Sequence, residues 1–304
     1  MKWRAIWQTP KKAVLDFIQD DAITLAAALA FYAMLSLAPL LVLALTVLGF
    51  LGEPTQQRVI EQTETLIGPQ ASQGLELLLQ NASAQRVAAT ASAIIGLVTV
   101  ILSATAVFVQ LQYSLNRIFN VRAKRGAVKG WLYKRFMSLL TVFAIGLVIV
   151  ASVVASSVIS FMFQGAGPAA QIINLAVSLV VFTLIFVILF RFLPDIKITW
   201  KDTLAGAVIA GLLFVIGQYA VGMYLGSTGV SSVYGGAGAL VILLLWVYYS
   251  AIILFLGAEM TQAYAAVVGK EIVPNEFAEW TPAAARAHEK RPEPEPEPAH
   301  AGVE

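Results

Sequence analysis

Six long apolar runs constrain what this chain can fold into more than any other feature. They cover about residues 23–50, 88–113, 136–163, 171–192, 203–225 and 239–264. Each run is long enough to cross the hydrocarbon core of a bilayer as a helix, which takes roughly 20 apolar residues. With 59% hydrophobic and 12% charged residues, the 304-residue chain carries more apolar surface than one soluble core would bury. We therefore predict an all-α membrane bundle of about six transmembrane helices, forming a domain over residues 22–268.

The distribution of basic residues predicts the orientation of this bundle. If the N-terminus is placed on the cytoplasmic side, the four inside segments hold four, seven, three and four Lys or Arg residues. The outside segments hold two, Arg58 and Arg86. Because Lys and Arg concentrate in the short loops on the cytoplasmic side, both termini are predicted to be cytoplasmic.

Three segments outside the apolar runs have characters of their own. Residues 1–21 predict an amphipathic helix on the membrane surface, in which Thr9 caps a helix that has Pro10 in its first turn. Residues 53–87 are polar with apolar residues at helical spacing, so we expect an insertion of short helices outside the membrane. Residues 269–304 are rich in Pro and Glu, which predicts a disordered cytoplasmic tail.

Side chains suited to catalysis are scarce. The chain has no cysteine, and its two histidines, His288 and His300, both lie in the predicted tail. A hydrolase needs a positioned base, a nucleophile or a metal site, so we expect no enzymatic activity, no metal site and no cofactor. The basic stretch over residues 116–135 is accounted for by topology and by anionic lipid headgroups. The predicted partner is therefore the lipid bilayer, with no nucleic acid.

Glu259 is the most informative single residue, because it lies inside the last apolar run. Ionisable side chains within a span are costly and suggest function by default. Two interpretations stay open, a structural salt bridge and a role in transport. Arg117 is the first candidate for its partner, with Arg135 and Arg191 as alternatives.

Two further features carry open alternatives. Asp20 and Asp21 precede the first span, where they could cap a helix or bind a cation or a proton. Pro39, inside the first span, predicts a kink. Residues 226–238 form a loop rich in glycine and serine before the last span. It is either an ordinary outer loop or a broken segment that lines a binding site, since irregular backbone at membrane depth needs such surroundings.

Five motifs in this sequence resemble those of the YihY/BrkB family of membrane proteins. They are Asp-Asp-Ala-Ile-Thr-Leu-Ala-Ala-Ala-Leu-Ala-Phe-Tyr over residues 20–32, Leu-Asn-Arg-Ile-Phe over 115–119, Tyr-Gly-Gly-Ala-Gly over 234–238, Leu-Leu-Trp-Val-Tyr-Tyr-Ser over 244–250 and Gly-Ala-Glu over 257–259. The resemblance marks a set of candidate functional positions. They are Asp20, Asp21, Tyr32, Ser36, Pro39, Asn116, Arg117, Tyr234, Gly235, Gly238, Trp246, Ser250 and Glu259.

The resemblance implies a multi-pass protein of the bacterial inner membrane. The family once carried the label ribonuclease BN, and another member is linked to serum resistance, which implies a role in the cell envelope. We predict a transporter or exporter of a small or lipid-like solute. The alternative is a non-transporting envelope scaffold, and a ribonuclease is the least favoured reading. The sequence predicts no particular substrate, coupling ion or oligomeric state.

Overall fold

The computed structural model describes residues 2–50, 106–124, parts of 140–151, 168–228, 236–268 and 272–289. The predictions for residues 53–87, for Tyr234 and for Gly235 lie outside the described residues. The chain divides into two compact units. Unit 1 comprises residues 1–20, 114–215 and 255–304, and unit 2 comprises residues 21–113 and 216–254.

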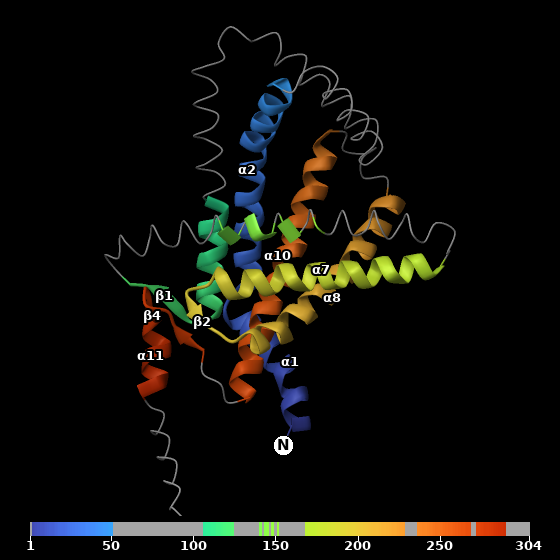
Figure 1. Cartoon of the computed structure of the whole chain (residues 1–304). Coiled ribbons are helices and arrows are strands. Elements are labelled where there is room, and N and C mark those ends of the chain that lie inside the picture. Colours follow the sequence, from blue (N-terminus) through green and yellow to red (C-terminus); the bar gives the residue numbers. More distant parts are fainter. Residues whose placement is uncertain are drawn as a thin grey trace, which may run out of the picture. The chain divides into compact units, whose positions relative to one another are not determined.

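The described part of the chain is mostly helical (Figure 1), as predicted. Its helices are α1 (Lys2–Gln19), α2 (Ala22–Phe50), α7 (Pro168–Phe192), α8 (Trp200–Thr228), α10 (Gly236–Val268) and α11 (Pro282–Glu289), together with a helical segment over residues 106–118. Within the described ranges, three stretches are long and apolar enough to cross a membrane: Leu175–Phe192, Trp200–Gly217 and Leu243–Val268. The apolar stretch Ala22–Ser36 of α2 is shorter.

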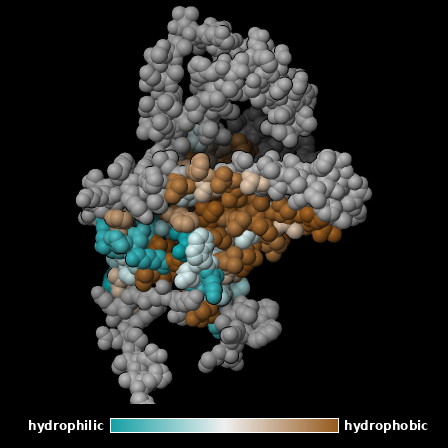
Figure 2. Space-filling model, viewed as in Figure 1, coloured by the Kyte–Doolittle hydropathy of each residue, from teal (hydrophilic) through white to brown (hydrophobic). Residues whose placement is uncertain are grey.

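Helix α7 carries large exposed apolar side chains along its length. Large side chains along it stand outside the protein interior, among them Ile172, Val180 and Leu184, which are 67%, 58% and 47% exposed. Figure 2 shows this apolar surface in brown along α7 and a hydrophilic surface in teal around the strands of the same unit. Apolar side chains exposed along a long helix suit a lipid environment, because lipid gives them an apolar solvent.

Within the described residues, two small antiparallel sheets accompany the helices and reach into the segment that was predicted to be disordered. β1 (Val121–Ala123) pairs with β4 (Ala278–Trp280), and β2 (Ile196–Lys197) pairs with β3 (Val273–Pro274). Figure 1 shows β1 and β4 side by side, with α11 next to β4. The segment over residues 272–289 is ordered because connections from elsewhere in unit 1 provide partners for its backbone groups. The Pro- and Glu-rich residues 290–304 lie outside the described residues.

Helices continue past two predicted ends. Both helices reach into the range 226–238 that was expected to be a loop, since α8 ends at Thr228 and α10 begins at Gly236. Glycine disfavours helix by about 1 kcal/mol, but backbone groups at membrane depth gain more from bonding within a helix. α1 also runs through Pro10 rather than starting there. Thr9 and Ala13 are buried on the same face, so the packed stripe continues across the proline.

Close contacts bring α8, α10 and α7 together within unit 1. A methyl group on Gly206 of α8 would collide with the Thr261 side chain and the Gly257 carbonyl of α10. A methyl group on Gly257 would lie 2.9 Å from the Phe190 ring of α7. These glycines therefore allow backbones to approach closely, as small residues do between membrane helices.

Candidate functional site

Glu259 is completely buried, at 0% exposure, in the part of α10 that belongs to unit 1. Neither of its carboxyl oxygens has a hydrogen-bond partner within the described part of the chain. It lies about two and a half turns before the end of α10 at Val268, deeper than the expected helix end near Tyr264 implied. A buried polar group without a partner is costly, so Glu259 calls for an explanation.

α1 approaches α10 through small side chains. Ala13 of α1 packs in one cluster with Met260 and Ala263 of α10, and Ile209 of α8 packs against the same cluster. One helical turn beyond Ala13, Phe17 is also buried. This contact places the end of α1, where the next residue after Gln19 is Asp20, beside the buried Glu259.

Asp20 lies at the short turn between α1 and α2. Its backbone N–H donates to the Asp16 carbonyl at 2.8 Å, which ends α1, and Asp21 turns the chain with a φ of 52°. Asp is one of the few residues that tolerate this left-handed conformation. The Asp21 carbonyl then accepts from the backbone N–H groups of Thr24 and Leu25, so Asp21 lies at the start of α2.

The carboxyl of Asp20 lies within hydrogen-bonding reach of the Glu259 carboxyl. Two ionised carboxylates carry no proton between them, which is why both Glu259 oxygens remain without a donor. If one of the two groups holds a proton, a carboxyl–carboxylate hydrogen bond engages one oxygen of each group. The arrangement therefore differs from the expected cap, since Asp20 faces Glu259.

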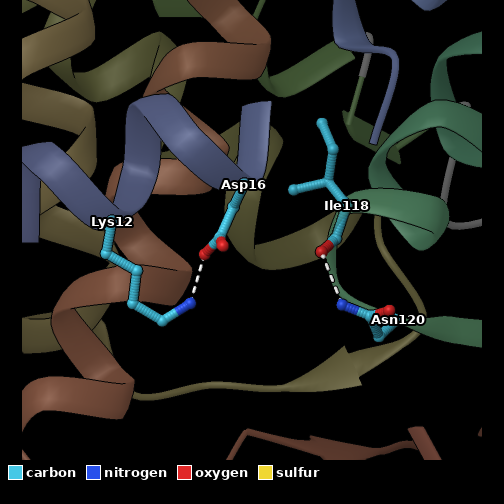
Figure 3. Close-up of polar contacts among 4 residues, drawn as sticks. All are labelled: Lys12, Asp16, Ile118 and Asn120. Carbon is cyan, nitrogen blue, oxygen red and sulfur yellow. Dashed lines mark hydrogen bonds and ion pairs between the residues drawn. The ribbon is translucent and has the colours of Figure 1, made fainter. Parts of the chain in front are cut away.

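Three charged side chains act on this pair. Lys12 and Asp16 form an ion pair on α1 (Figure 3), and Arg117 acts on Asp20 from the helix over residues 106–118. Burial raises the pKa of the Asp20 carboxyl above its ordinary value, and the Asp16 carboxylate adds to this rise. The contact with Glu259 and the positive charges of Arg117 and Lys12 lower that pKa without cancelling the effect of burial.

The predicted salt bridge between Glu259 and Arg117 is wrong, because the Glu259 oxygens accept no hydrogen bond and Arg117 acts on Asp20 instead. Arg191 is also engaged elsewhere. It donates to the Ile198 carbonyl, and its guanidinium lies 4.4 Å from the centre of the Trp200 ring. The sequence predicted that Arg117 and Glu259 lie at a similar depth in the membrane. It did not predict which helix faces Glu259. Arg135 lies outside the described residues.

Asn116 belongs to a second polar cluster in unit 1, centred on Asp195. The Asn116 amide donates to Asp195 Oδ2 at 2.8 Å, and the Asp195 N–H donates back to Asn116 Oδ1 at 2.7 Å. Asn275 adds a backbone N–H bond to the Asp195 carbonyl at 3.0 Å. The cluster thus joins the end of the helix over residues 106–118, the connection after α7 and the segment before β4.

Asp195 and Asn275 were missed as candidates. Asp195 is 3% exposed, although its position in a short polar connection after Pro194 suggested a solvated loop. Asn275 lies in the segment predicted to be disordered. A single acidic residue next to a proline was the available signal, and it is equally typical of an ordinary turn.

The remaining candidate residues lie in unit 2 or outside the described side chains. Ser36 of α2 donates to the Ala33 carbonyl at 2.7 Å, and Ser250 of α10 donates to the Trp246 carbonyl at 2.8 Å. The Tyr32 ring packs edge-on against a neighbouring phenylalanine, with ring centres 6.1 Å apart. These contacts are local to their own helices. α2 continues through Pro39 and α10 includes Gly238, but the side-chain surroundings of these two positions lie outside the described part.

Curated relatives are similar to this chain over most of its length. A UPF0761 membrane protein of Stenotrophomonas maltophilia is 28% identical over 262 residues, which are 82% of this chain and 59% of that protein. Relatives of the same description from Legionella pneumophila and Tolumonas auensis are 30% and 26% identical, covering 83% and 85% of this chain and 60% and 82% of their own. The chain therefore spans about three fifths of the Stenotrophomonas and Legionella relatives.

No solved structure matches the chain. The family model described as virulence factor BrkB matches residues 13–279. This range includes α1 from Ala13 onward, the buried Glu259, and the ordered segment through β3 that pairs with the rest of unit 1. Because the match covers most of the chain, and because the relatives are membrane proteins, the protein belongs to the BrkB family of membrane proteins.

Proposed function

We propose that the protein is a transporter or exporter of a small or lipid-like solute in the bacterial inner membrane. In this proposal it crosses the bilayer about six times, with both termini in the cytoplasm, and catalyses no reaction. The observation that carries the proposal is Glu259, a fully buried carboxyl within the candidate span Leu243–Val268 that accepts no hydrogen bond from any described residue. A purely structural helix gains nothing from such a group, whereas transporters use intramembrane acids to bind ions and substrates.

Two further features that support the proposal place polar groups among the apolar helices. Asp20 faces Glu259. This contact gives the buried acid a polar neighbour at the end of residues 1–21, the segment predicted to lie on the membrane surface. Ser36 and Ser250 place hydroxyl groups inside long apolar helices. The description "virulence factor" fits an envelope role for this family.

Single-cysteine accessibility tests the proposal, because the native sequence has no cysteine. Ser36→Cys and Ser250→Cys replace partly buried hydroxyls with a thiol of similar size. Leu245→Cys, at a position 53% exposed on the same helix as Ser250, is the matched control for a lipid-facing site. Ser72→Cys, in the predicted outer insertion, is the control for full access and for orientation. Intact cells are labelled with a membrane-impermeant maleimide.

Labelling of Ser36→Cys or Ser250→Cys, with Leu245→Cys silent, is the expected result and indicates a water-filled path. Silence at both positions while Ser72→Cys reacts would replace the transporter by a closed envelope scaffold. The expectation of no catalysis has its own test. Purified protein should leave RNA intact. RNA cleavage by the purified protein would overturn the expectation that it catalyses no reaction.

A further inference from the structure

In the Asp20–Glu259 pair a fully buried acid faces a partly exposed one, and this arrangement favours a proton between them. Glu259 is 0% exposed, and neither oxygen meets a donor from any described residue. The Asp20 carboxyl lies within hydrogen-bonding reach of it. If both groups were ionised, two negative charges would be adjacent and the Glu259 charge would be fully buried, which is strongly unfavourable.

The surrounding charges do not provide the missing donor. From α1, Lys12 is bonded to Asp16, and these side chains are 44% and 21% exposed, so they remain in contact with solvent. Asp16 adds a further negative charge that acts on both carboxyls. From the helix over residues 106–118, Arg117 acts on Asp20. The neighbouring helix α8 contacts α10 through Gly206, which carries no charge.

A proton suits this site better than a metal ion. Magnesium and calcium require about six or more oxygen ligands, most of them from carboxylates, carbonyls and water. Within the described ranges, no three His, Cys, Asp or Glu side chains come together in a way that could hold a metal ion. One proton between two facing carboxyls, by contrast, gives each group a hydrogen bond and leaves the pair with one negative charge.

We propose that Asp20 and Glu259 share one proton and form the proton-binding site of this membrane protein. The shared proton lies in a hydrogen bond between the two carboxyls, and a second proton arriving from water makes the pair neutral. Binding and release therefore change the charge buried beside α10 by one unit at a time. The site itself does not depend on transport. Only the further step, in which this proton is the coupling ion, rests on the function proposed above.

Infrared spectroscopy of the full chain in lipid nanodiscs tests the site directly, because only a protonated carboxylic acid has a separate carbonyl stretch. The samples are wild type, Glu259→Gln, Asp20→Asn and the matched control Glu279→Gln. Glu279 is 42% exposed and paired with Arg122, so its removal changes a carboxylate without touching the pair. Spectra are recorded at pH 7 and across a titration, and size-exclusion chromatography checks that each variant is folded.

We expect wild type and Glu279→Gln to keep one carboxylic-acid signal at pH 7. Glu259→Gln should lose it, and Asp20→Asn should shift its frequency because the hydrogen-bond partner changes. Equal spectra for wild type and both pair variants would overturn the proposal. So would a wild-type signal that appears only when sodium and potassium are replaced by a large organic cation, since a metal ion would then occupy the site.

A measurement of proton flux distinguishes proton binding at this site from proton transport across the membrane. Proteoliposomes that contain a pH-sensitive dye are given an outward or inward pH gradient, with wild type and Glu259→Gln compared at equal protein content. Flux in wild type that falls at least tenfold in Glu259→Gln supports coupling. If wild type shows the infrared signal but no proton flux, the proton-binding site stands and its role in coupling is refuted.

Discussion

Asn116→Ala tests whether the polar cluster around Asp195 supports unit 1. The substitution removes one hydrogen bond to the Asp195 carboxylate, at 2.8 Å, and the acceptor of the Asp195 N–H, at 2.7 Å. A hydrogen bond to a charged group contributes about 1.5–3 kcal/mol and a neutral one about 0.5–1.5 kcal/mol. Because Asp195 is almost fully buried, water does not replace either bond. We expect a loss of about 2–4 kcal/mol in the free energy of unfolding.

The assay is reversible unfolding of the full chain in mixed detergent micelles, followed by tryptophan fluorescence. Arg122→Ala is the matched control, since it also removes a contact between distant segments of unit 1, the exposed Arg122–Glu279 ion pair at 2.9 Å. Exposed ion pairs contribute below about 1 kcal/mol, so this variant should stay close to wild type. Equal losses for the two variants would refute the reasoning, because burial of Asp195 would then carry no extra cost.

Three other predictions follow from the described contacts. Gly206→Ala should destabilise the protein by about 1–3 kcal/mol or more, because its methyl group collides with Thr261; a thermal midpoint equal to wild type in detergent would contradict the close approach. Asn120 has a φ of 58°, so Asn120→Ala should cost about 1–2 kcal/mol while Asn120→Gly should be tolerated, as unfolding of the two variants side by side will show. Asp20 has a raised pKa, so the folded state holds a proton that the unfolded state has lost above the ordinary value of 3.8. Stability should therefore fall as pH rises through this window, and Asp20→Asn should flatten the dependence measured by unfolding at a series of pH values.

The helices could be predicted from the sequence, and their ends only partly. Uncharged runs of this length have few structural solutions in a bilayer, so α7 and α8 lie where the fourth and fifth runs predicted them. The ends moved outward because helix continues wherever backbone groups lack other partners. The total of six spans and the orientation remain predictions.

The short strands could not be predicted. β2 and β3 have two residues each, which is too short for any alternation of polar and apolar side chains to show. Their pairing also joins segments that are far apart in the chain, as Asn116 and Asp195 are, 79 residues apart. Sequence patterns report on neighbours along one element, and not on which distant element comes to lie beside it.

For the same reason, the residues of the candidate site could be predicted but their contact could not. Glu259 and Asp20 were both singled out, since an acid in a span and an acidic pair before a span are unusual by themselves. Their contact was not predicted, because it depends on α1 packing against α10 through Ala13 and Met260. Opposite charge made Arg117 the natural partner for Glu259, and the packing of α1 brings a second acid there instead.

The pairing of β1 with β4 has a consequence for the time course of synthesis. Arg122 and Glu279, which face each other in this sheet, are 157 residues apart in the chain. Ribosomes add about 5–20 residues per second, so β1 waits about 8–30 s for its partner strand to be made. During that interval the edge of β1 is open to other chains, and a segment made later completes the sheet that β1 began.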